Sequence, residues 1–139
     1  MIFVTRRAQF SASHRLHNPE LSDDENRAIF GLCNNPNGHG HNYEVEVVVR
    51  GDPDPTTGMT INLRDLKEIL EKRVVRIANH RSLDHDVPFM AGRLSTTENL
   101  AVAIWEVVEP HLQHGVLHLV RVRESENNMV EYTGPGSGT

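Results

Sequence analysis

Residues 39–50 read H-G-H-N-Y-E-V-E-V-V-V-R, a run in which apolar and polar residues alternate. The apolar positions are Tyr43, Val45, Val47 and Val49. Such alternation is typical of a β-strand with one buried face. Residues two apart on a strand point to the same side, so a strand that starts at His39 places His39 beside His41. Imidazole is a good zinc ligand, and we therefore predict part of a metal site at this strand end.

Residues 2–14 form a second predicted strand, in which Phe10, Ala12 and His14 share one face. If the two strands pair as an antiparallel hairpin, the end of the first lies beside the start of the second. This pairing brings His14 next to the two histidines of the other strand. Three histidine ligands and an open fourth position are typical of a catalytic zinc site. His17 is the alternative third ligand, and the strand alternation favours His14.

The rest of the chain predicts two helices and two more strands. In chain order we expect a long connection (18–38), a turn (51–60), a helix (62–78), a loop (79–94), a second helix from residue 95, and strands at 116–124 and 129–132. The second helix opens with a capping-box pattern, S-T-T-E at residues 95–98, and is expected to kink or end near Pro110.

The order β-β-α-α-β-β predicts an α+β fold with a four-stranded antiparallel sheet and two helices on one face. We expect these elements to form one domain over residues 1–139. An open sheet leaves exposed edges, and joining subunits edge to edge would cover them, so oligomerisation is expected.

The composition limits the partners and the compartment. A formal net charge of −5 argues against a nucleic-acid-binding module, which usually carries a basic excess. A single cysteine excludes an internal disulfide framework and suits a reducing compartment. No apolar run reaches membrane-spanning length. The apolar stretch at the start, Met1 to Val4, is too short for the hydrophobic region of a signal peptide. We therefore expect a soluble, cytoplasmic protein with neither a nucleic-acid nor a membrane partner.

Several stretches resemble the 6-pyruvoyl-tetrahydropterin synthase family. They are F-S-A-S-H-R-L (10–16), F-G-L-C-N-N-P-N-G-H-G-H-N-Y (30–43), S-T-T-E-N-L-A-V (95–102) and E-S-E-N-N-M-V (124–130). The related 6-carboxy-tetrahydropterin synthase of the queuosine pathway typically has a shorter spacing, C-x3-H-G-H. The C-x5-H-G-H spacing here favours the pyruvoyl enzyme.

The resemblance implies a tunnelling fold, in which trimers close a barrel of joined sheets and pair as hexamers with active sites at subunit interfaces. It implies zinc on His14, His39 and His41. The reaction that it implies eliminates triphosphate from 7,8-dihydroneopterin triphosphate and rearranges the side chain to a diketone. Arg15 and Arg81 are candidates for contacts to the phosphates.

The family pattern also suggests residues for catalysis and for pterin binding. Cys33 lies in a loop rich in asparagine and glycine that could fold its thiol over the metal, and a thiolate of lowered pKa is a suitable base. The carboxylate of Glu124 could accept two N–H bonds from the guanidine-like edge of a pterin. The segment of Thr96, Thr97 and Glu98 would contact the pterin as well as open a helix.

One dipeptide departs from the family pattern. The family has an Asp-His pair where this chain has Asn79 and His80. His80 takes the place of the catalytic histidine, but asparagine cannot stabilise an imidazolium by charge. Asp84 could supply that charge instead. A second register places the pair at Asp84 and His85, and we reject it because it breaks the downstream D-V-P match.

Two other functions remain open at this point. The chain could act on the same substrate as a 6-carboxy-tetrahydropterin synthase. It could also be a pterin- or metal-binding oligomer with reduced catalysis, for which Asn79 would be the marker.

Overall fold

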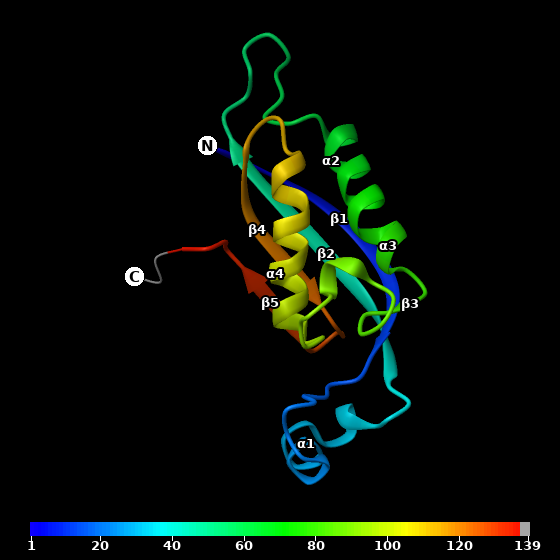
Figure 1. Ribbon diagram of the computed structural model, residues 1–139. Helices are drawn as coiled ribbons and strands as arrows, with labels where there is room; N and C mark the ends of the chain where they lie inside the picture. The colour runs from blue at the N-terminus through cyan, green and yellow to red at the C-terminus, as the bar shows by residue number, and fades with distance from the viewer. Residues whose placement is uncertain (137–139) are drawn as a thin grey trace.

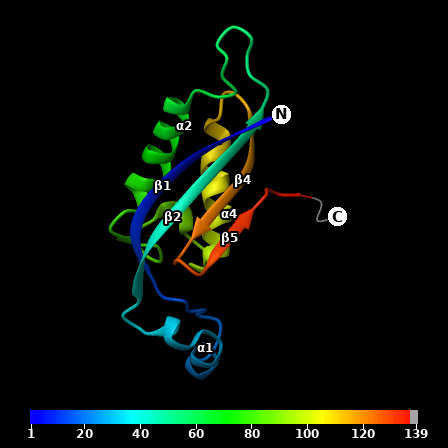
Figure 2. The ribbon, with the colours of Figure 1, turned by 180° about the vertical axis from the view of Figure 1, so that it is seen from behind.

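A single sheet carries α2 and α4 against one of its faces in this computed structural model (Figure 1). The view from behind shows the strands in front of these two helices (Figure 2). The structure describes residues 1–136, and residues 137–139 of the expected domain lie outside the described part. The strands are β1 (Ile2–His14), β2 (His39–Gly51), β3 (Arg81–Ser82), β4 (Val116–Arg123) and β5 (Met129–Tyr132), and the helices are α1 (Asp23–Phe30), α2 (Leu63–Leu70), α3 (Arg76–Ala78) and α4 (Thr97–Val108).

The predicted hairpin of β1 and β2 is confirmed, and β1 ends at His14 while β2 begins at His39. The strands pair antiparallel from Ile2 opposite Gly51 to His14 opposite His39. The prediction of four antiparallel strands is wrong, because the sheet has five strands in the order β3-β1-β2-β4-β5 and β3 runs parallel to β1. β3 has only two residues, too few to leave an alternating pattern in the sequence.

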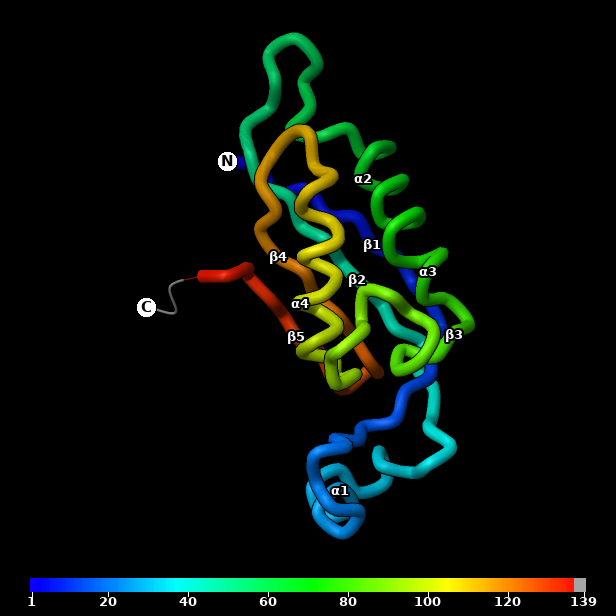
Figure 3. The backbone as a smooth tube through the Cα atoms, in the orientation of Figure 1, coloured from blue at the N-terminus to red at the C-terminus, as the bar shows by residue number. Residues whose placement is uncertain are grey.

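The connection between β1 and β2, predicted as a loop, contains α1 and a 3₁₀ turn, Gly31–Asn34. The side chain of Ser22 accepts the backbone N–H of Glu25, and the Glu25 side chain accepts that of Ser22. This capping box, together with acidic residues in the first turn, stabilises a short helix. The backbone trace shows that the segment extends beyond the end of the sheet (Figure 3).

The helix predicted at residues 62–78 forms as one continuous helical segment, with a π-helical turn, Glu71–Val75, between α2 and α3. Asn62 caps it, because its side-chain oxygen accepts the N–H of Arg64 at 2.9 Å. The first residue of α2, Leu63, is exposed although it is apolar. The buried positions of the segment are Leu66, Leu70, Val74 and Ala78.

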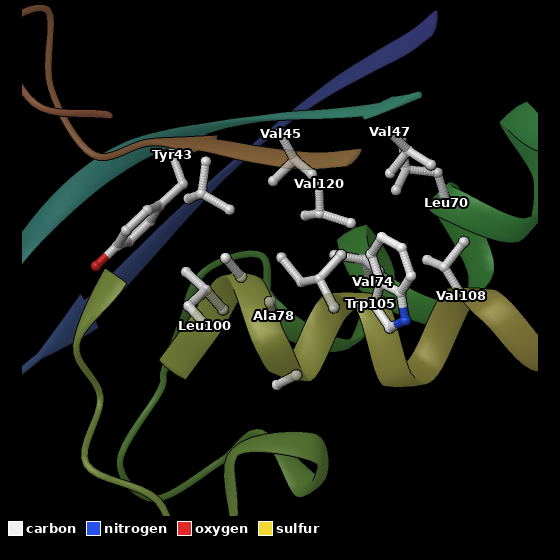
Figure 4. Packing of buried hydrophobic residues seen from close by; sticks show 14 of the residues in the cluster. Tyr43, Val45, Val47, Leu70, Val74, Ala78, Leu100, Trp105, Val108 and Val120 are labelled. Carbon is white, nitrogen blue, oxygen red and sulfur yellow. The ribbon is translucent and has the colours of Figure 1, made fainter. Parts of the chain in front are cut away.

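The core lies between the sheet and the two helices (Figure 4). Leu100, Trp105 and Val108 of α4 face the strands. Each fully buried apolar side chain of this size stabilises the fold by about 1.5–3 kcal/mol. α4 ends at Val108, just before Pro110, as expected. No helix within residues 1–136 is both long and apolar enough to cross a membrane.

Candidate functional site

Three histidines meet at one end of the sheet because of the register between β1 and β2. His14 is the last residue of β1 and lies opposite His39, the first residue of β2, while His41 lies opposite Ala12. The side chains at positions 14, 39 and 41 share the sheet face that also carries Phe10 and Tyr43. The expected hairpin geometry therefore brings the three imidazoles together.

The imidazole nitrogens are spaced as ligands of one ion. The Nε2 atoms of His14 and His39 lie 3.2 Å apart, and one nitrogen from each of the three histidines lies within 4.8 Å of the others. Two nitrogens bound to tetrahedral zinc at its usual bond lengths lie about 3.3 Å apart. The observed separation of His14 and His39 agrees with that geometry.

The ring of His14 is held by a backbone carbonyl. Its Nδ1 lies 2.7 Å from the carbonyl oxygen of Ser95. A carbonyl only accepts hydrogen bonds, so Nδ1 carries the proton and Nε2 presents its lone pair to the other histidines. The hydroxyl of Tyr43 lies 3.5 Å from the same Nδ1. Burial, with a smaller contribution from nearby acidic groups, raises the pKa of Tyr43, so this phenol stays protonated.

The surroundings of the other two histidines favour the neutral form, which metal binding requires. Burial is the main cause that lowers the pKa of His39 and of His41, the neighbouring His14 lowers both further, and the carboxylate of Glu124 acts in the opposite direction on both. Nε2 of His41 is buried and has no hydrogen-bond partner among residues 1–136. A buried nitrogen without a partner is costly unless it binds something. The three residues therefore fit a metal ion.

Glu124 lies directly after β4, one residue beyond the strand, and adjoins the histidines. Its Oε1 is 3.5 Å from Nε2 of His41, and its Oε2 accepts a hydrogen bond from the hydroxyl of Thr97. Glu124, Thr97 and Glu98 line one cavity of about 330 Å³ together with residues 127–130. The structure thus places a hydrogen-bonded carboxylate and a ligand-sized space beside the candidate metal centre.

Comparison with known proteins gives a consistent result. The family model for 6-pyruvoyl tetrahydropterin synthase matches residues 3–135. The chain belongs to the 6-pyruvoyl tetrahydropterin synthase family. This confirms the resemblance seen in the sequence motifs.

Individual members of the family match most of the chain. The 6-pyruvoyl tetrahydrobiopterin synthase of Homo sapiens is 54% identical over 131 residues, which span 94% of this chain and 90% of that protein. The enzyme of the same name from Poecilia reticulata is 50% identical over 132 residues, spanning 95% of this chain and 90% of its own. The solved structure of Caenorhabditis elegans 6-pyruvoyl tetrahydropterin synthase has a TM-score of 0.91 and 42% identity, and the match covers 96% of both chains.

The segment of Thr96, Thr97 and Glu98, which the family pattern assigns to pterin binding, forms the start of α4. It does not form the expected capping box. The N-cap is Thr96, whose hydroxyl accepts the N–H of Asn99 at 3.2 Å. The predicted box between Ser95 and Glu98 is wrong, because the hydroxyl of Ser95 donates to Asp84 at 2.6 Å instead. The helix therefore begins one residue later than the motif suggested.

Cys33 lies in the 3₁₀ turn between α1 and β2 and is half-buried with a free thiol. Its carbonyl accepts the N–H of Leu16 at 2.9 Å, which ties the turn to the chain just after β1. Nε of Arg15 donates to the carbonyl of the next residue, Asn34, at 2.9 Å. His17, the alternative ligand, hydrogen-bonds to the side chain of Asn34 at 3.0 Å and is not part of the histidine group.

His80 and Asn79 lie at the edge of β1. Oδ1 of Asn79 accepts the N–H of Ser11 at 2.9 Å, and the N–H of His80 donates to the carbonyl of Ser11 at 2.6 Å. His80 has a φ of 62°, a left-handed conformation that is uncommon for any residue other than glycine. Such strained positions are often found at functional sites.

Within one chain, His80 is not part of the metal-histidine group. It lines a cavity of about 530 Å³ together with Ser13, Asn42, Arg81 and one of the three clustered histidines, His41. By strand alternation, the side chains of Ser13 and Asn42 point to the sheet face opposite the three clustered histidines. Glu124 lines a different cavity, and Cys33 lines neither of the two, so a single chain does not bring the expected catalytic residues into one cavity.

Sequence reasoning missed the part that Ser95 plays beside His14. The contact is made by a backbone carbonyl, which every residue has, so no sequence signal could have identified it. Asp84, considered as a charge partner for His80, instead accepts hydrogen bonds from Ser95 and from the N–H of Arg15.

Proposed function

We propose that this protein is a zinc-dependent carbon–oxygen lyase that eliminates triphosphate from 7,8-dihydroneopterin triphosphate and gives 6-pyruvoyl-tetrahydropterin. The observation that carries the proposal is the contact between the histidine group and Glu124, whose carboxylate lies 3.5 Å from His41. A metal centre and an acceptor for the pterin edge thus form one site in a member of this family.

His14, His39 and His41 would hold the zinc and leave a position open toward the substrate. Bound there, zinc would supply Lewis acidity to the two side-chain hydroxyls and make the adjacent C–H bonds more acidic. The protein keeps the ligands ready for this role by burial, which lowers the pKa of His39 and His41, and by the bond from His14 to Ser95.

Glu124 would orient the pterin. An ionised carboxylate accepts hydrogen bonds only, and its two oxygens match the two N–H donors of the pterin's guanidine-like edge. The hydroxyl of Thr97 fixes one of those oxygens, which reduces the freedom of the carboxylate before the substrate arrives. Glu98 and Thr97 line the same cavity, and Thr96 holds the helix end that carries them.

Cys33 would act as the base that removes the carbon-bound proton. The thiolate is the reactive form of cysteine, and a nearby zinc ion or cationic histidine would favour it. His80 would serve as the second acid–base group. The amide oxygen of Asn79 accepts the N–H of Ser11, so Asn79 would support the strand edge next to His80 and would not stabilise a positive charge on His80.

We place the complete site at contacts between subunits of a homohexamer built as a dimer of trimers. Support comes from the position of His80, which lines a different cavity from Glu124 in one chain. The outer strands of the described sheet are β3 and β5, and joining them between copies would cover their edges and build a barrel. The single cysteine suits the reducing cytoplasm, which is the compartment we propose.

A second candidate function is the 6-carboxy-tetrahydropterin synthase reaction on the same substrate. The C-x5-H-G-H spacing from Cys33 to His41 favours the pyruvoyl product. Incubation with 7,8-dihydroneopterin triphosphate, followed by mass spectrometry of the pterin, tests this choice. We expect 6-pyruvoyl-tetrahydropterin and one released triphosphate per product. A 6-carboxy product would select the other enzyme, and bound but unchanged substrate would select a binding protein.

A further inference from the structure

Asp84 connects to the metal ligand His14 from two directions. Its Oδ2 accepts the backbone N–H of Arg15, the residue after His14, at 2.7 Å. Its Oδ1 accepts the hydroxyl of Ser95 at 2.6 Å. The carbonyl of Ser95 in turn accepts Nδ1–H of His14 at 2.7 Å. A single carboxylate therefore holds both the chain that carries His14 and the residue that orients its ring.

The residues that follow Ser95 extend this connection to the pterin side of the site. Thr96 caps α4 through its hydroxyl, and the hydroxyl of Thr97 donates to Glu124. Ser95 and Thr97 are both buried. Residues 95–97 thus touch the metal ligand at one end and the candidate pterin anchor at the other, so the position of this short segment affects both.

We propose that Asp84 is a positioning residue, which fixes residues 95–97 through Ser95 and thereby directs Nε2 of His14 toward the metal. The inference rests on the proposed metal site. Groups that hydrogen-bond to the second nitrogen of a metal-binding histidine fix its tautomer and orientation, and their loss weakens metal binding. Here Ser95 makes that contact to His14, and Asp84 acts one hydrogen bond further away, by accepting the hydroxyl of Ser95.

The alternative role for Asp84 is to supply negative charge, for example to His80. Both of its oxygens already accept hydrogen bonds from Arg15 and Ser95, which favours the geometric role. The two roles predict different effects of substitution. Asparagine can accept from the N–H of Arg15 with its oxygen and donate to the hydroxyl oxygen of Ser95 with its nitrogen, but it has no charge. Alanine makes neither bond.

The test compares zinc affinity among Asp84→Asn, Asp84→Ala, Ser95→Ala and the wild type, by competition with a chromophoric chelator. Asp84 is exposed, so its removal opens no cavity in the core. We expect Asp84→Ala and Ser95→Ala to weaken zinc binding about 10- to 100-fold and Asp84→Asn to weaken it less than about threefold. Asp86→Ala is the matched control, because Asp86 lies in the same loop and accepts only the N–H of Ser82, at 3.0 Å.

Thermal unfolding of the metal-free proteins separates positioning from a general structural role. A lower melting temperature with unchanged zinc affinity in Asp84→Ala and Ser95→Ala would overturn the proposal. Equal losses of affinity in Asp84→Asn and Asp84→Ala would overturn it in favour of charge. If Asp84→Ala does not fold, Ser95→Ala decides, because it removes only a hydroxyl. A wild type that binds no zinc would instead contradict the proposed function, on which this inference depends.

Discussion

Nε2 of His41 and Oε1 of Glu124 lie 3.5 Å apart, although His41 lies in β2 and Glu124 follows the end of β4, far away in the sequence. The pairing of β2 with β4 brings them together, since Glu44 lies opposite Arg123 and Glu124 follows at the strand end. The contact joins the candidate metal centre to the candidate pterin anchor. Metal binding and pterin binding depend on different side chains, so the two functions can be tested separately.

Glu124→Gln should weaken pterin binding and leave zinc binding unchanged. Glutamine has one acceptor oxygen in place of two, so one N–H donor of the pterin loses its partner in a desolvated site. The expected loss is about 1–3 kcal/mol of binding free energy. Direct titration with a pterin, together with zinc analysis of the same samples, measures both effects. An unchanged pterin affinity would rule out the anchor.

Cys33→Ala should lower triphosphate release about 10²- to 10⁴-fold, because it removes the proposed base. Zinc and pterin should still bind, since Cys33 belongs neither to the histidine group nor to the Glu124 cavity. In the wild type, the thiol should react readily with iodoacetamide near neutral pH. A variant that retains full activity would assign the base to another residue.

Asn79→Asp should raise the rate at least about tenfold if His80 is the acid–base group, because a carboxylate stabilises the imidazolium as it forms. Aspartate can still accept the N–H of Ser11, so the edge of β1 should be retained. Triphosphate release by the two proteins gives the comparison. The register we chose would be wrong if His80→Ala kept the wild-type rate while His85→Ala abolished it.

Tyr43→Phe should remove part of the loss of stability at alkaline pH. The folded protein raises the pKa of Tyr43 above its ordinary value of 10.0. Above about pH 10 the unfolded chain releases a proton that the folded protein keeps, so the free energy of unfolding falls by about 1.4 kcal/mol per pH unit. Below pH 10 the contribution is fully present. Denaturant unfolding of both metal-free proteins between pH 8 and 11 measures the difference, and identical slopes would contradict it.

The parts of the site that the sequence revealed are those that depend on strand periodicity. Because side chains alternate with a period of two, the apolar run from Tyr43 is enough to predict that His39 and His41 share one face. The hairpin register then placed His14 opposite His39. α1 was missed, although Ser22 and Glu25 carry the pattern of a capping box.

Other features leave no trace in a single sequence. The parallel pairing of β3 with β1 involves two residues and depends on the tertiary position of the loop. The left-handed backbone of His80 and the bond from His14 to the Ser95 carbonyl depend on backbone groups, which are the same in every residue. The motif at residues 95–98 predicted a helix start but not which hydroxyl would cap it.

The histidine group itself can be examined by metal analysis. His39→Ala should lose most of its zinc and remain folded, because the site lies at the end of the sheet and not among the apolar core residues. His17→Ala is the control and should keep its zinc, since His17 bonds to Asn34 instead. Full zinc occupancy in both His14→Ala and His39→Ala would show that these histidines are not the zinc ligands.

The most direct measurement is the titration of zinc into the metal-free wild type, with the rate of triphosphate release from 7,8-dihydroneopterin triphosphate recorded at each addition. The rate should be near zero without metal, rise in proportion to bound zinc and level off at about one zinc per chain. His39→Ala should show no such rise over the same range. A full rate in the metal-free wild type, or an equal response from His39→Ala, would contradict the account.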